Sequence, residues 1–166
     1  MRILYLLYQW LIAYPLLIVI TLITSLTVII GSLLGSRDFW GYYPPMIWAR
    51  CFCLLLFIRT EVRGRDNIDP RTSYVFVANH QGAFDIFLIY GYLEHNFKWM
   101  MKDSLRKLPF VGKACYDTGH IFVNRSSPQK EIFVKAIKTL KSGTALGIDF
   151  AIELTETQYI LSATVR

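Results

Sequence analysis

The sequence predicts an α/β domain that follows a hydrophobic, membrane-associated N-terminal segment. Three observations predict this class. The 166-residue chain has no charged residue between Arg2 and Arg37. Beyond residue 59, short apolar runs alternate with segments of helical character, which is typical of α/β sheets. The clearest helical segment, residues 128–141, has its apolar positions on one face. We therefore expect a membrane-anchoring helical segment at residues 1–58 and an α/β domain at residues 59–166.

The N-terminal apolar stretch, residues 3–36, would measure about 50 Å as a straight helix, against a hydrocarbon core of about 30 Å. It is too long for one upright span, and Pro15 kinks or breaks a helix. We expect either a tilted span with an interfacial turn or a shallow helical hairpin. Pro44-Pro45 is expected to end this segment. Residues 46–58 are too few to span and are expected to lie in the interface or beneath the globular part.

Positive charge is more frequent after the first apolar stretch than before it, which favours a globular part on the cytoplasmic side. A cleaved signal peptide is the rival interpretation. The apolar region is much longer than a usual signal-peptide core, and no Ala-x-Ala site follows it.

The net charge of +6 does not indicate a nucleic-acid partner, since there is no zinc-ligand pattern and no basic stripe with interleaved aromatic residues. Lys98, Lys102, Arg106, Lys107 and Lys113 are expected to form a basic surface cluster, facing either anionic headgroups or solvent. The three cysteines show no paired spacing, which fits reduced thiols in the cytoplasm.

Within the domain, the apolar runs predict four strands, at residues 74–78, 98–101, 120–123 and 144–150. Helices are predicted at residues 84–93, 104–107 and 128–141. Residues 61–72 are polar and predict a short strand and a turn. The run at residues 74–78 is continuously apolar, which indicates burial on both faces of a sheet.

A histidine and an aspartate follow the first of these strands. His80 comes two residues after the end of the strand, and Asp85 comes five residues later. A carboxylate that holds one imidazole nitrogen fixes the tautomer, and the other nitrogen can then act as a general base on a hydroxyl. The carboxyl end of a strand is also where α/β folds place their sites. The alternative is that His80 caps a turn and Asp85 supports the helix that follows.

Three segments in order resemble one family. Residues 79–85, Asn-His-Gln-Gly-Ala-Phe-Asp, resemble the Asn-His-x4-Asp motif of the glycerolipid acyltransferases, in particular the bacterial 1-acyl-glycerol-3-phosphate acyltransferases. Residues 102–112 resemble the segment between the first two motifs of that family. Residues 119–125, Gly-His-Ile-Phe-Val-Asn-Arg, are similar to the second motif, Gly-x-x-Phe-Ile-Asp-Arg, with Asn124 in place of aspartate. The resemblance covers roughly residues 72–148 and implies a mixed sheet flanked by helices.

The family's third motif, Phe-Pro-Glu-Gly-Thr-Arg, is altered in this chain. Glu153 and Thr155 align with its glutamate and threonine. Leu154 replaces the glycine and Glu156 replaces the arginine, which reverses the charge. We expect an acyltransferase whose C-terminal part is truncated or altered. A frameshift, a truncation and a real variant all remain open.

The resemblance implies transfer of a fatty acyl group from acyl-CoA or acyl-carrier protein to the 2-hydroxyl of 1-acyl-glycerol-3-phosphate, giving phosphatidic acid in phospholipid biosynthesis. His80 would deprotonate the hydroxyl and Asp85 would hold His80. Gly82 would permit close backbone approach. Arg125 would bind the acceptor phosphate. Gly119 and Asn124 belong to the same substrate-binding motif.

The resemblance also implies that transfer is direct and requires no cofactor beyond the acyl donor. The expected partners are lysophosphatidate, the donor and membrane lipids at a bacterial inner membrane. No metal is expected, although His80, Asp85 and His120 remain an alternative ligand set without a recognised ligand pattern. The rival functions are an inactive, membrane-bound homologue and an acyltransferase for another lyso-lipid. For Arg125, a plain surface position is the alternative.

Overall fold

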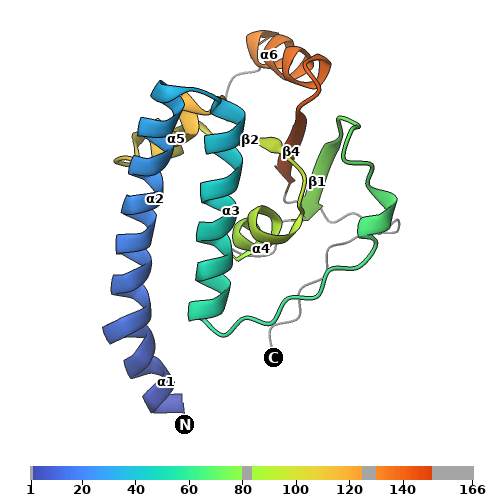
Figure 1. The fold of residues 1–166 in the computed structure, drawn as a ribbon. Coiled ribbons are helices and arrows are strands. Elements are labelled where there is room, and N and C mark those ends of the chain that lie inside the picture. Colours follow the sequence, from blue (N-terminus) through green and yellow to red (C-terminus); the bar gives the residue numbers. More distant parts are fainter. Residues whose placement is uncertain (1, 80–83, 125–129, 151–166) are drawn as a thin grey trace.

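A helical hairpin lies beside an α/β unit in the computed structural model of the chain, which describes residues 2–79, 84–124 and 130–150 (Figure 1). The first arm is one long, continuous, apolar helical segment. It consists of α1 (Arg2–Tyr8), a π-helical turn (Gln9–Ala13) and α2 (Tyr14–Leu34). Pro15 lies in the first turn of α2, directly after the π-helical turn, so the chain remains helical past it.

The second arm of the hairpin is α3 (Arg37–Leu55), which runs back beside α2. Ser36 caps α3, because its Oγ accepts a hydrogen bond from the Phe39 backbone N–H at 3.3 Å. The prediction that Pro44-Pro45 ends the first apolar segment is wrong, since both prolines lie inside α3. The reversal occurs instead at residues 35–36. Tertiary packing of α3 outweighs the backbone hydrogen bonds that the two prolines remove.

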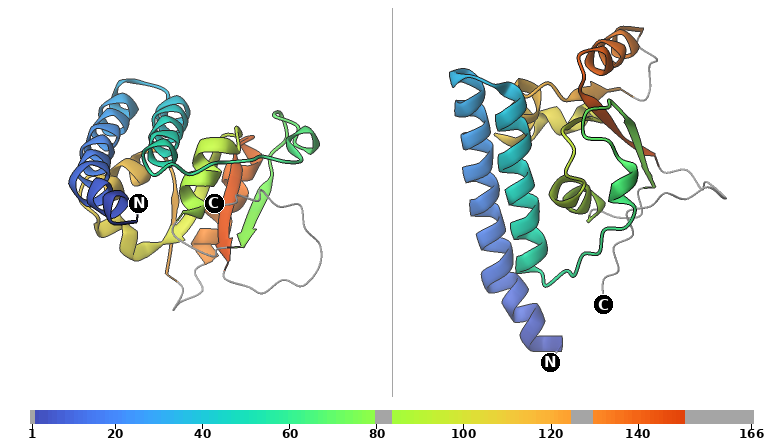
Figure 2. Two further views of the ribbon diagram at one scale, coloured as in Figure 1. Left: turned by 90° about the horizontal axis from the view of Figure 1, so that it is seen from below. Right: turned by 45° about the vertical axis from the view of Figure 1, so that its right-hand side comes forward.

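Helix α3 lies between α2 and the α/β unit (Figure 2), and aromatic side chains hold it there. The ring of Phe52 stacks on that of Phe87 in α4, with centroids 3.5 Å apart and an interplanar angle of 9°. Trp48 packs on the same Phe87 ring at 4.9 Å, and its Nε1–H donates to Thr21 Oγ1 in α2 at 2.8 Å. One face of α3 is thus part of the core of the α/β unit.

The sheet contains β1 (Val75–Asn79), β2 (Phe97–Lys102), β3 (Ile121–Val123) and β4 (Ala145–Phe150). Its strand order is β1-β4-β2-β3, and all three pairings are parallel. On one face lies α4 (Asp85–Tyr92), with α3 behind it. On the other face lies α6 (Lys130–Lys141), packed through Ile132 on Ile121 and Leu146. The α/β class is confirmed.

Shorter elements connect these parts. They are a 3-10 turn, η2 (Arg65–Asn67), a second one, η3 (Asp103–Lys107), and the helix α5 (Val111–Asp117). The strand predicted within residues 61–72 is wrong, because η2 is the element described there. Helix α5 was not predicted. It starts two residues after Pro109, where the sequence indicated only the end of a short helix.

In the described part of the chain, Ile3–Leu34 is the one helical stretch that is long and apolar enough to cross a membrane. A buried core helix and a signal sequence pass the same test of length and composition. The division of the chain at residue 58 stays a prediction.

Candidate active site

The carboxyl ends of the four parallel strands meet in one row. Asn79 at the end of β1 pairs with Phe150 of β4, and Lys102 at the end of β2 pairs with Val123 of β3. Met100 pairs with Ile148, which places the ends of β2 and β4 level. Open parallel sheets bind ligands at the carboxyl ends of their strands. The sheet therefore brings the start of the first motif segment and the end of the second to the same row of strand ends.

The first motif lies partly outside the described residues. His80 and Gly82 belong to the undescribed part, so the proposed pairing of His80 with Asp85 stays a prediction. Asp85 is the first residue of α4 and lies in its first turn. A carboxylate is favoured there by the helix dipole. Phe87 fixes this turn against α3 through its stack on Phe52.

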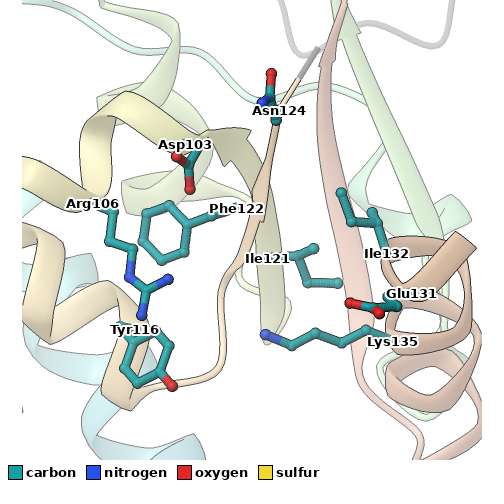
Figure 3. Close-up of a pocket in the computed structure, with 9 residues that line it drawn as sticks. All are labelled: Asp103, Arg106, Tyr116, Ile121, Phe122, Asn124, Glu131, Ile132 and Lys135. Atoms are coloured by element: carbon teal, nitrogen blue, oxygen red, sulfur yellow. The ribbon is translucent and has the colours of Figure 1, made fainter. Parts of the chain in front are cut away.

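The second motif begins at a turn and ends beside a hollow. Gly119 has φ +88°, a left-handed conformation, and the space where a Cβ would lie is open to 4 Å. Glycine is required there for the backbone turn from α5 into β3, rather than for close packing. Asn124 directly follows β3 and lines the hollow (Figure 3). Arg125 lies outside the described residues, and its phosphate contact stays a prediction.

His120, inside the second motif, is a buried structural residue. The Trp99 backbone N–H donates to its Nδ1 at 2.8 Å, so the neutral ring carries its proton on Nε2. That Nε2–H donates to the Tyr90 hydroxyl oxygen at 2.9 Å. Burial, then the charges of Lys98 and Lys135, lower the pKa of His120 to about 3. His120 thus joins α4 to the second motif as a neutral ring.

The contacts of His120 concern the alternative in which His80, Asp85 and His120 would bind a metal ion. Both ring nitrogens of His120 are hydrogen-bonded to protein groups. Within the described ranges, no group of three His, Cys, Asp or Glu side chains is placed to hold a metal ion.

The prediction that Lys98 belongs to a basic surface cluster is wrong, because Lys98 is buried. Its ammonium forms an ion pair with the Asp38 carboxylate of α3 at 2.9 Å. Gly41, also in α3, lies close to the same ammonium. Lys98 therefore ties β2 to the tip of the hairpin. The other four members of the cluster are exposed, namely Lys102, Arg106, Lys107 and Lys113.

Lys102 is a candidate site residue that sequence reasoning missed. It was grouped with surface lysines because strand order is not visible in one sequence. The register places it at the carboxyl end of β2, opposite Val123 and one residue from Asn124. The signal was its position at the end of a predicted strand, the same signal that selected His80.

A hollow of about 360 Å³ lies between β3, the η3–α5 segment and α6 (Figure 3). Its lining includes the side chains of Asp103, Arg106, Tyr116, Ile121, Phe122, Asn124, Glu131, Ile132 and Lys135. The Arg106 guanidinium lies 4.5 Å from the centre of the Tyr116 ring. Such cation–π pairs hold a guanidinium in place at a surface.

The sheet edge and its motif residues define a class of protein. A model of the Acyltransferase family matches residues 59–150, and the chain belongs to that family. The match includes both motif segments and ends before the altered third motif.

Curated relatives are 1-acyl-sn-glycerol-3-phosphate acyltransferases. The chain is 34% identical over 119 residues to that of Saccharomyces cerevisiae, covering 69% of the chain and 36% of the relative. Identity is 33% over 93 residues with that of Borreliella burgdorferi, covering 55% and 37% respectively. The chain is 30% identical over 92 residues to a 1-acyl-sn-glycerol-3-phosphate acyltransferase of Chlamydomonas reinhardtii, which covers 55% of the chain and 27% of the relative. The chain thus spans about a third of the length of these relatives. No solved structure gives a significant match.

Proposed function

We propose that this protein is an O-acyltransferase that moves a fatty acyl group from a thioester donor to the 2-hydroxyl of 1-acyl-glycerol-3-phosphate. The observation that carries the proposal is the family match over residues 59–150, which contains both motif segments. The names of the curated relatives support this acceptor. The product would be phosphatidic acid.

In the proposed reaction the acceptor oxygen attacks the thioester carbonyl carbon while His80 takes its proton. Asp85, at the start of α4, would hold the ring and stabilise the imidazolium. The C–S bond breaks, and the thiol leaves with the proton that His80 returns. All atoms are accounted for by the two substrates, so the step requires no further cofactor.

Two cations, one of them at the carboxyl end of β2, would form the proposed acceptor site. Arg125 follows Asn124 directly, and Lys102 lies at the end of the neighbouring strand. A guanidinium suits bidentate contact with phosphate oxygens, and an ammonium adds a point charge. Two cations, one that ends a strand and one that follows the adjacent strand, thus offer a phosphate site in the same row of strand ends as the proposed base.

We also propose that the hairpin enters one leaflet and does not cross the bilayer. One side of α3 packs on α4 through Phe52 and Phe87, so a crossing hairpin would draw the α/β unit into the hydrocarbon. The outer side of α2 exposes large apolar residues, including Ile18, Ile23 and Leu33. Such an arrangement is that of an interfacial anchor.

The assay for transfer uses labelled acyl-CoA and acyl-carrier protein with lysophosphatidate in detergent. Because residues 152–156 depart from the third motif, a restored chain carrying Ile152→Pro, Leu154→Gly and Glu156→Arg is assayed beside the natural one. Transfer is expected in the restored chain, with loss of at least a hundredfold in His80→Ala or Asp85→Asn. Asp66→Asn, an exposed carboxylate in η2, is the control and keeps full activity.

A second candidate function is a membrane-bound homologue without transfer activity. Glu156 and Leu154, in place of an arginine and a glycine, favour it. A restored chain that is folded but transfers nothing from either donor would support this candidate and contradict the enzyme proposal.

A further inference from the structure

The hollow beside the second motif passes around the free edge of β3. Neighbouring residues of a strand point to opposite faces of a sheet. Ile121 and Phe122 are neighbours, and both line the hollow (Figure 3). The hollow therefore wraps the outer edge of the strand. β3 pairs with β2 on its inner side, and within the described sheet it is a terminal strand.

The walls of this edge groove carry charge in a defined order. Arg106 and Tyr116 come from the η3–α5 side, and Lys135 comes from α6. The Lys135 ammonium lies 3.4 Å from the His120 carbonyl oxygen, at the amino end of β3. Asn124 lies at the carboxyl end (Figure 3). Two cations thus mark the end of the groove away from the row of strand ends that forms the candidate active site.

We propose that this groove holds the phosphopantetheine arm of the acyl donor, the extended diamide that acyl-CoA and acyl-carrier protein share. The phosphate lies on Arg106 and Lys135, and the thioester points past Asn124 toward the strand ends. This inference rests on the proposed function, because it names the donor part that the same site takes.

The chemistry of the arm matches the groove in three respects. Its two amides can pair with the edge of β3 that no described strand covers, as extended chains pair with free strand edges. Its phosphate finds two cations of different elements. Its amide and hydroxyl hydrogens find acceptors in the carboxylates of Asp103 and Glu131, which also line the groove.

The acyl chain of a lipid fits this groove less well. Ile121, Ile132 and Phe122 form only a short apolar floor. A hydrocarbon chain would cover the charged rim without offering it any hydrogen bond, which costs free energy.

Binding to the purified full-length chain tests the inference without any need for turnover. The probes are 4′-phosphopantetheine and CoA, titrated calorimetrically in detergent. Arg106→Gln and Lys135→Gln are each expected to weaken both probes by roughly tenfold to a hundredfold, the value of a charge-assisted hydrogen bond. Lys141→Gln, an exposed lysine of α6 outside the groove lining, makes the same charge change and should leave both affinities unaltered.

The outcomes separate the two sources of the ligand and the two proposals. Weakened binding of CoA alone would assign the cations to the nucleotide and overturn the inference, as would unchanged binding of both probes. A restored chain that binds both probes but transfers nothing keeps this inference and refutes the proposed function. A restored chain that transfers, and whose donor KM is unaltered in Arg106→Gln and Lys135→Gln, refutes this inference alone. Unchanged thermal unfolding of each variant shows that the groove itself is intact.

Discussion

The buried ring of His120 makes the stability of the fold depend on pH. The pKa of His120 is about 3 in the folded chain, against an ordinary value of 6.5. As the pH falls below about 6.5, the unfolded chain takes up a proton that the folded chain refuses. The contribution of His120 is therefore complete above pH 6.5 and is lost progressively as the pH falls toward 3.

The magnitude follows from this window. Between pH 7.5 and pH 5.0 only the part below about 6.5 counts, roughly 1.5 pH units at about 1.4 kcal/mol each, so the loss is about 2 kcal/mol. Such a loss is a large fraction of a typical unfolding free energy of about 5–15 kcal/mol. The structural reason is that a proton on Nδ1 would face the Trp99 N–H that this atom now accepts.

Urea unfolding in detergent, followed by tryptophan fluorescence, measures this effect at pH 7.5 and pH 5.0. The variant His120→Gln keeps a neutral polar side chain but cannot titrate. The stability difference between the natural chain and this variant should shrink by about 2 kcal/mol at the lower pH. Every other titrating group is common to the two proteins and cancels. An unchanged difference would refute the assignment of His120 as a buried neutral ring.

Three further predictions follow from single contacts. Gly112→Ala would place its Cβ 2.2 Å from the Arg106 carbonyl oxygen, so the free energy of unfolding in urea should fall by about 1–3 kcal/mol. The control is Gly91→Ala in α4, whose Cβ would meet only ordinary contacts; this change should be neutral or slightly stabilising. Arg125→Ala in the restored chain should raise the acceptor KM roughly tenfold to a hundredfold and leave the donor KM unchanged; equal effects on both would indicate a structural role. Carbonate and high-salt washes should leave the chain in the membrane fraction, and its release would contradict insertion of the hairpin.

Local patterns in the sequence located most of the domain. The apolar runs predicted all four strands to within two residues, and β1 at Val75–Asn79 ends next to the predicted base, His80. The helical period at residues 128–141 predicted α6, which begins at Lys130. The period of α6 reflects the burial of one helix face. The continuous apolar run of β1 located the strand, but the burial on both faces that it indicated is wrong, because Val75 and Val77 are exposed.

Features that depend on distant partners were not predictable. Lys98 looks like its charged neighbours, and only the approach of Asp38 from the hairpin explains its burial. Pro44 and Pro45 look like a helix end, but packing on α2 and α4 keeps them inside α3. The edge groove required the strand order, because β3 is a terminal strand only once β4 is known to lie between β1 and β2.

The strand order also determines when each strand can find its partner during synthesis on the ribosome. β4 is the last described strand to be synthesised, yet it occupies the middle of the sheet, between β1 and β2. From the end of β1 at Asn79 to the end of β4 at Phe150, 71 more residues must be added. At about 5–20 residues per second this takes roughly 4–14 s. Throughout that interval β1 has no partner within the described sheet, so the nascent chain carries an unpaired strand edge that is prone to aggregation until β4 arrives.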